Sequence, residues 1–131
     1  MPINLLCVAV GGGLGAVCRY LCGLIPVAEC GGFPIMTLLI NFVGALLIGI
    51  IAEIADSAAN AYFNISDKVI LLLKVGFCGG FTTFSTFSLE MFNLVDRGKV
   101  WLALAYALVS VVICFAGVLL GRYLIKTIFA K

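Results

Sequence analysis

The run from 76 to 90 gathers the side chains of this sequence that are best suited to bind a small anion. It reads Gly-Phe-Cys-Gly-Gly-Phe-Thr-Thr-Phe-Ser-Thr-Phe-Ser-Leu-Glu and lies inside a long apolar segment. Hydroxyl groups donate hydrogen bonds and the edges of aromatic rings are electropositive, so both attract an anion. The rings recur every three residues with hydroxyl residues between and after them: Phe81, Thr82, Thr83, Phe84, Ser85, Thr86, Phe87 and Ser88.

The same run contains a weak point for helix formation. Gly79 and Gly80 are adjacent, and glycine loses more backbone freedom in a helix than any other residue. We therefore expect this helix to break at the glycine pair, in the middle of the membrane. Unpaired backbone is costly in hydrocarbon, so such a break persists only where protein, water or an ion satisfies it. Freed carbonyls and helix ends at membrane depth are the groups with which membrane proteins build ion sites.

Composition places this chain in a membrane. Of its 131 residues 64% are hydrophobic and only 11% are charged, and the mean hydropathy is +1.28. A soluble domain is about half apolar and about a quarter charged. The predicted fold class is an all-α integral membrane protein, formed as a single domain over 1–131. Since a span needs about 20 residues, we predict four transmembrane helices, over about 3–25, 34–53, 69–94 and 100–125.

Several polar residues lie within these spans and have alternative interpretations. Arg19 either extends to the interface or is a buried cation that orients helices or attracts anions. Asn41 either bonds a neighbouring helix or faces a polar pathway. Glu90 is interpreted as an interfacial carboxylate, and Lys74 as a side chain that reaches back to the interface. Tyr106 and Ser110, four residues apart, present hydroxyls on one face.

Other features favour structure over chemistry. Two pairs of small residues have the spacing of close helix packing in membranes: Gly11 with Gly15, or Gly12 with Ala16, in the first span, and Gly117 with Gly121 in the fourth. Ser66 precedes the third span and is suited to cap it. The six cysteines accompany apolar segments and form no zinc pattern or readable disulfide framework. Histidine is absent and the net charge is only +2, which disfavours acid–base catalysis and nucleic-acid binding.

The charges that set membrane orientation are weakly biased. Four spans put both termini and the middle loop on one side, with Lys68, Lys126 and Lys131, and Arg122 close by. The other side carries Arg97 and Lys99. Because lysine and arginine set orientation, so small a bias permits insertion both ways. Four short helices are too few to enclose a pore comfortably, so we expect a homo-oligomer, and dual topology would allow an antiparallel dimer.

The sequence resembles the fluoride channel family, small bacterial proteins known as Fluc or CrcB. The Thr-Thr-Phe-Ser-Thr-Phe-Ser run is highly specific, whereas the glycine cluster alone would not be. The match covers nearly the whole chain in order, and its pieces are 12–20, Thr37, Asn41 and Gly44, 76–88 and Tyr106.

This resemblance implies an antiparallel, dual-topology homodimer in the bacterial inner membrane, with two fluoride pathways. It implies that Phe84 and Phe87 form a box of rings along each path. It implies a structural sodium ion (Na+) at the dimer centre, held by the backbone carbonyls of Gly79 and Thr82 from both chains. The implied function is passive export of cytoplasmic fluoride, which protects the cell. The polar lining or support would come from Asn41, Ser85, Thr86, Ser88 and Tyr106.

Three rival interpretations remain at this stage. A small multidrug exporter also has four spans and dual topology, but it needs a carboxylate deep in a span, and the first span has no acid. An intramembrane enzyme needs a nucleophile–base pair or a metal cluster. A structural membrane subunit would explain the glycines, but not rings and hydroxyls concentrated around one break.

Overall fold

The computed structural model describes residues 1–26, 31–58 and 65–129, and within them every regular element is a helix. The elements are α1 (Pro2–Gly23), α2 (Ile35–Ala58), α3 (Asp67–Ile70), η1 (Leu71–Phe77), α4 (Cys78–Phe81), α5 (Phe84–Asp96) and α6 (Val100–Phe129). Four stretches are long and apolar enough to cross a membrane: Pro2–Gly23, Ile35–Asp56, Asp67–Asp96 and Val100–Phe129. The predicted helical membrane fold with four spans is therefore confirmed.

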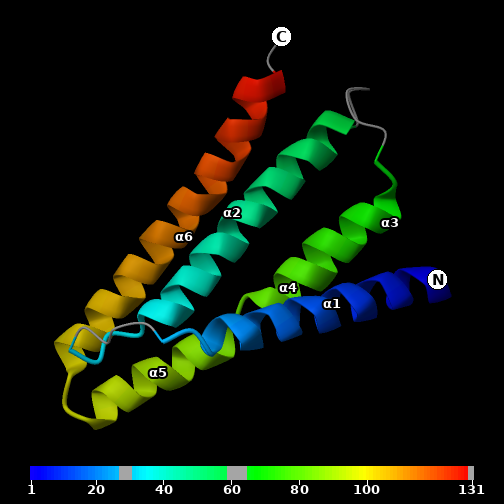
Figure 1. The fold of residues 1–131 in the computed structure, drawn as a ribbon. Helices are drawn as coiled ribbons and strands as arrows, with labels where there is room; N and C mark the ends of the chain where they lie inside the picture. The colour runs from blue at the N-terminus through cyan, green and yellow to red at the C-terminus, as the bar shows by residue number, and fades with distance from the viewer. Residues whose placement is uncertain (27–30, 59–64, 130–131) are drawn as a thin grey trace.

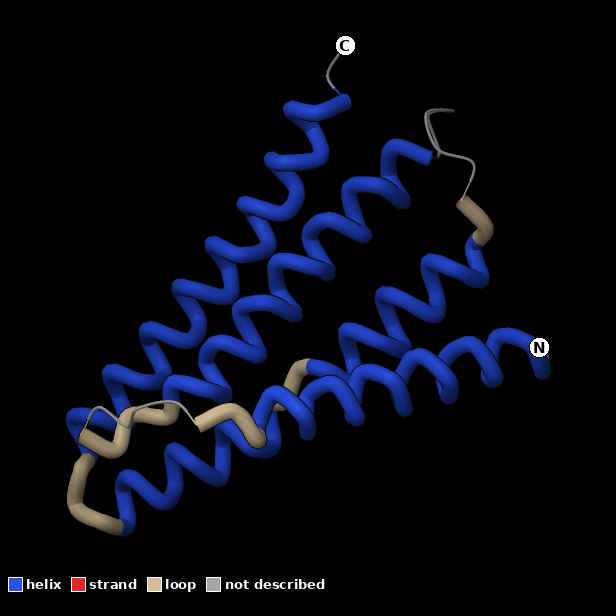
Figure 2. Tube along the Cα trace, in the orientation of Figure 1, coloured by secondary structure: helices blue, strands red, loops and turns tan. Residues whose placement is uncertain are grey.

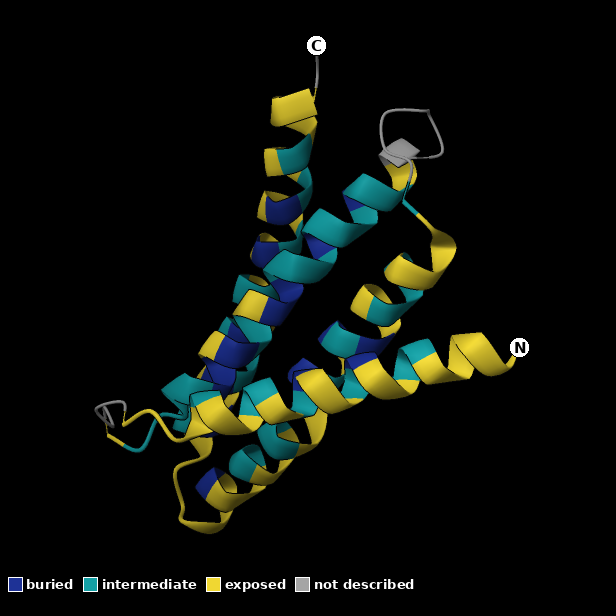
Figure 3. Ribbon diagram, turned by 45° about the vertical axis from the view of Figure 1, so that its right-hand side comes forward, coloured by how far each residue is buried: buried dark blue, intermediate teal, exposed yellow. Residues whose placement is uncertain are grey.

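The helices pack as two associated groups. α2 and α6 lie side by side along much of their length, and α1 lies beside η1 and α4 (Figure 1). α5 turns away from α4 and packs against α6. A small core forms where α5, α6 and the start of α2 meet, from Leu38, Leu94, Ala103 and Tyr106. Buried residues concentrate on the facing sides of the helices, and the outward faces are exposed (Figure 3).

The third span is built from four short helical pieces and one interruption. Ser66 begins it as predicted, with its side chain accepting from the N–H of Lys68 at 3.3 Å. η1 is a π-helical segment of seven residues, which widens the helix before α4. Thr82 (ψ 158°) and Thr83 (φ −146°, ψ 114°) then leave the helical conformation. Figure 2 shows this two-residue link between α4 and α5.

Two predicted boundaries are wrong. Gly79 and Gly80 remain helical in α4, and the interruption falls at Thr82 and Thr83. The helices of the second and third spans also extend beyond the predicted 34–53 and 69–94, because α2 continues to Ala58 and α3 begins at Asp67. The segment 59–64 between them lies outside the described residues, as does Cys30.

Glycines allow α1 to touch the third span through backbone atoms. A Cβ on Gly11 would lie 3.0 Å from Gly76 Cα, and still closer to the Leu72 carbonyl oxygen. A Cβ on Gly15 would lie 2.7 Å from the backbone nitrogen of Phe81. These contacts confirm the predicted packing role of the first pair. The second pair acts likewise against α2, because a Cβ on Gly121 would lie 2.9 Å from the Ile50 nitrogen.

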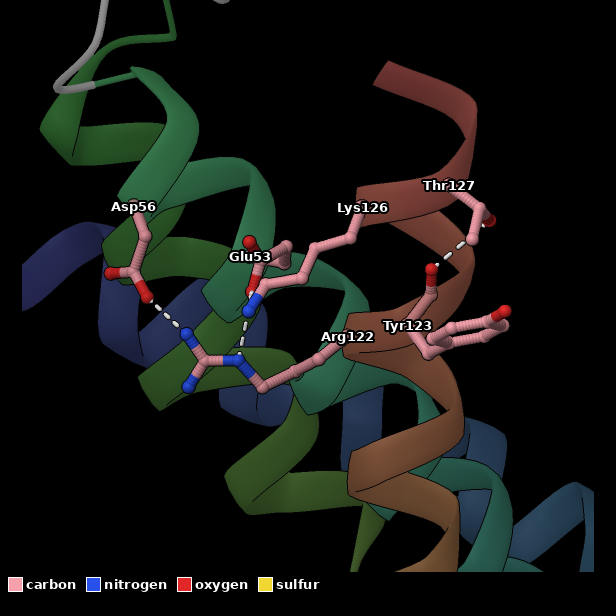
Figure 4. A network of polar contacts seen from close by, with 6 residues as sticks. All are labelled: Glu53, Asp56, Arg122, Tyr123, Lys126 and Thr127. Carbon is pink, nitrogen blue, oxygen red and sulfur yellow. Dashed lines mark hydrogen bonds and ion pairs between the residues drawn. The ribbon is translucent and has the colours of Figure 1, made fainter. Parts of the chain in front are cut away.

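An ionic network ties α2 to α6 at the end of the molecule near the C-terminus (Figure 4). Arg122 donates from Nε to Glu53 Oε2 at 2.9 Å and also pairs with Asp56. Lys126 Nζ lies 4.0 Å from the same Glu53 oxygen. The Glu53 side chain is only 8% exposed. Its charge is therefore compensated within the described structure, as a buried carboxylate requires.

Candidate anion site at the helix break

Asn41 of α2 holds the interruption of the third span through two hydrogen bonds. Its Nδ2 donates to the Thr83 carbonyl at 3.1 Å, and its Oδ1 accepts from the Thr83 N–H at 2.8 Å. Both backbone groups of Thr83 are thus satisfied by one side chain, as buried backbone must be. Asn41 was predicted either to bond a neighbouring helix or to face a polar pathway. It bonds the neighbouring span, and it also lines a groove described below.

Arg19 of α1 also bonds to the third span close to the interruption. Its Nε donates to the Gly80 carbonyl at 3.1 Å, and the residue is half-buried. In a continuous helix that carbonyl would pair with the N–H of Phe84, but the interruption removes this partner. Of the two alternatives for Arg19, the structure therefore shows the cation that bonds between helices.

The interruption leaves the carbonyls of Gly79 and Thr82 without the partners that a continuous helix would provide. The N–H of Thr83, which would pair with Gly79, is bonded to Asn41 instead. The N–H of Thr86, which would pair with Thr82, is bonded to Thr83 Oγ1 at 3.1 Å. These are the two carbonyls that the resemblance assigns to sodium. Oxygen donors of this kind suit a hard cation, so the residues present fit the implied ion.

Hydroxyl groups cluster around Thr83, which caps α5. Thr83 Oγ1 donates to Thr86 Oγ1 at 3.0 Å and lies 3.3 Å from Ser85 Oγ. Ser88 differs, because its hydroxyl donates to the Phe84 carbonyl of its own helix at 2.8 Å. The hydroxyls of Ser85 and Thr86 therefore contact the Thr83 hydroxyl, whereas the hydroxyl proton of Ser88 is donated to the Phe84 carbonyl.

The aromatic rings form a row that runs from the exposed surface into the core. Phe84 is 79% exposed, and the centroid of its ring lies 5.6 Å from that of Phe87. Phe87 in turn lies 5.0 Å from the ring of Tyr106, which contacts Phe33 edge-on at 5.3 Å. The two predicted rings are therefore in contact, with Phe84 exposed and Phe87 half-buried.

Glu90 accepts two hydrogen bonds that were not predicted. Thr37 donates to Oε1 at 2.7 Å, and the Tyr106 hydroxyl donates to Oε2 at 2.8 Å. Tyr106 is fully buried, so its hydroxyl supports Glu90 and is not presented to an open path. The spacing of Thr37 four residues before Asn41 was the available signal, since it places both side chains on one helical face.

A wide groove of about 700 Å³ opens beside the break. Asn41, Thr83, Phe84 and Phe87 all line it, and so does Ser110. The Ser110 hydroxyl oxygen is buried and has no hydrogen-bond partner among the described residues. An unpaired buried hydroxyl is uncommon, and this one belongs to a residue that lines the groove. The predicted pair of hydroxyls thus separates, with Tyr106 bound to Glu90 and Ser110 facing the groove.

The chain is similar to known proteins along almost its whole length. A family profile described as "CrcB-like protein, Camphor Resistance (CrcB)" matches residues 6–122. A protein of Francisella philomiragia named fluoride-specific ion channel FluC is 41% identical over 129 residues, which are 98% of this chain and 99% of that protein. A protein of the same name from Ruminiclostridium cellulolyticum is 42% identical over 127 residues, 96% and 95% of the two chains. Another, from Pyrococcus horikoshii, is 42% identical over 118 residues, 86% and 91% of the two chains.

The fold and site define a class: a multi-pass helical membrane protein whose third span is interrupted beside clustered rings and hydroxyls. Within that class the chain belongs to the CrcB family, as the Thr-Thr-Phe-Ser-Thr-Phe-Ser run indicated.

Proposed function

We propose that this protein is a fluoride-selective ion channel that passively exports cytoplasmic fluoride. The observation that carries the proposal is the interruption at Thr82 and Thr83, clamped by Asn41 beside the rings of Phe84 and Phe87. The relatives named fluoride-specific ion channels support it, because their similarity extends over nearly the whole chain.

The chemistry of the site suits a small, strongly hydrated anion. To pass, fluoride must exchange its water for close donors, as permeant ions do in selectivity filters. Asn41 uses one N–H of its amide on Thr83, which leaves the second available. Ser110 adds an unpaired hydroxyl, and the two phenylalanine rings add electropositive edges. Among the described residues, those that line the groove include no carboxylate that would repel the anion.

Sodium has a structural role in this proposal. The carbonyls of Gly79 and Thr82 would hold the ion, together with the same carbonyls of a second chain. When bound, sodium would supply positive charge and would satisfy the carbonyls that the interruption leaves without their helical partners. The groups of this chain that prepare the site are Asn41 and Thr83, which take up the N–H groups that would otherwise bond those carbonyls.

The membrane potential would drive export. With the cell interior negative, it favours anion exit by about 2.3 kcal/mol per charge per 100 mV. Hydrogen fluoride enters an acid-exposed cell as a neutral molecule and ionises inside. A passive channel in the bacterial inner membrane would release the trapped ion and protect the cell.

Transport measurements in liposomes test this function. Liposomes that contain the purified protein and are loaded with potassium fluoride should release fluoride to a fluoride electrode when a potassium ionophore clamps the voltage. Liposomes loaded with potassium chloride should release chloride no faster than protein-free liposomes. Equal release of the two halides would contradict the selectivity that we propose, and release of neither would contradict the channel.

The proposed assembly is an antiparallel homodimer in which both orientations occur. The weak charge bias supports it, and so does Phe84, which is 79% exposed and available to a partner. In a variant whose six native cysteines are replaced with serine and whose C-terminus carries one added cysteine, a membrane-impermeant thiol reagent applied to intact cells should label about half of the molecules. Labelling of nearly all or nearly none would show one orientation and contradict the antiparallel dimer.

A further inference from the structure

Lys74 brings a charged group into the groove beside the helix break. The groove is about 700 Å³ and is mostly apolar, and Lys74 lines it together with Cys78 and Thr82. Lysine is the one charged residue among the lining residues in the described structure. Lys74, an exposed residue, therefore borders the same groove as Asn41 and the two phenylalanine residues.

No carboxylate among the described residues forms an ion pair with Lys74. The ion pairs recorded for the described residues join Arg122 and Lys126 to Glu53 and Asp56, at the end of α2. Arg19 is committed to the Gly80 carbonyl. The charge of Lys74 is therefore not neutralised by a paired carboxylate among the described residues, and its field can act in the groove that it borders.

Lys74 lies on the face of its helix that lines the groove and not on the face that packs against α1. Gly76 and Gly80 contact α1 through their backbone, whereas Lys74, Cys78 and Thr82 follow each other at four-residue spacing and line the groove. Lys74 lies seven residues after Asp67, so its Cα is about 10 Å along the helix axis from that end. The sequence predicted that Lys74 reaches back to the interface, and its place in the groove supports another role.

We propose that Lys74 is an anion-recruiting residue, which raises the concentration of fluoride in the groove ahead of Asn41. This inference rests on the proposed function. Clefts with charge of one sign and low-dielectric walls concentrate the opposite ion and accelerate its entry. Lys74 would act through its field without binding the ion, so its effect depends on ionic strength.

The test compares the initial rate of fluoride release for the wild type, Lys74→Gln, Lys74→Arg and Lys68→Gln. Lys68 is the matched control, because it lies in the same span but is not among the residues that line the groove. Rates are measured at about 0.01 M and about 1 M of an impermeant salt, where the Debye length is about 30 Å and about 3 Å. The ratio of the two rates within one variant does not depend on how much protein is active.

The expected result is that Lys74→Gln releases fluoride about threefold more slowly than the wild type at low salt and equally fast at high salt. Lys74→Arg and Lys68→Gln should match the wild type at both. The proposal is overturned if Lys74→Gln behaves as the wild type at both salt concentrations, or if it is slower by the same factor at both. In either case the wild type still conducts, which separates this failure from failure of the proposed function.

Discussion

Replacement of Asn41 with leucine is expected to lower fluoride release by at least about 30-fold. The side chain makes both hydrogen bonds that satisfy the backbone of Thr83, at 3.1 and 2.8 Å. A buried polar group that loses its partner costs about 1–3 kcal/mol. A loss of about 2 kcal/mol at the conducting arrangement corresponds to about 30-fold in rate. Leucine also removes the free N–H that we assign to the anion.

The variant Asn41→Asp distinguishes these contributions. Aspartate retains an acceptor for the Thr83 N–H but has no donor for the Thr83 carbonyl, and it adds a negative charge beside the rings. We expect it to fold better than Asn41→Leu and to conduct as poorly, because like charges repel in a poorly solvated site. Asn4→Leu is the control, since Asn4 is exposed near the start of α1, and it should conduct as the wild type. Normal conduction by either Asn41 variant would show that this side chain does not contribute to the fluoride pathway.

The position of the interruption shows what local sequence patterns can and cannot predict. Glycine propensity placed the break at Gly79 and Gly80, yet both are helical. The break falls three residues later because Asn41, 42 positions away in the sequence, takes both backbone groups of Thr83. The four spans could be predicted because hydropathy and length are properties of each segment alone. The residue at which a helix opens depends on a partner from another helix.

The same distinction applies to the site residues. Residue types alone indicated an anion site, since hydroxyls and rings share one short run. They could not indicate that Tyr106 donates to Glu90 while the Ser110 hydroxyl has no partner in the described part of the chain, because that depends on how α5 and α6 pack. They also could not indicate that Glu90, predicted to be an interfacial carboxylate, accepts hydrogen bonds from the hydroxyls of Thr37 and Tyr106.

Substitution of Gly15 with alanine is expected to be the most disruptive single-methyl change in α1. The added Cβ would lie 2.7 Å from the Phe81 nitrogen and 3.1 Å from the Gly80 carbonyl carbon. These are backbone atoms, which cannot rotate away as a side chain does, so the helices must separate. Overpacking of this kind costs about 1–3 kcal/mol. The separation would also lengthen the bond from Arg19 to the Gly80 carbonyl, which is 3.1 Å at present.

Gly13→Ala is a control within the same glycine cluster, because nothing lies within 4 Å of a Cβ at that position. Alanine there replaces a poor helix former at no steric cost, which stabilises a helix by as much as about 1 kcal/mol. The two substitutions add the same methyl group two residues apart. The midpoint of thermal unfolding in detergent should fall for Gly15→Ala and should rise or stay unchanged for Gly13→Ala. Fluoride release should fall only for Gly15→Ala. Equal midpoints and equal release would mean that contact between α1 and α4 does not set the geometry around the break, and Arg19 would then need another means of reaching Gly80.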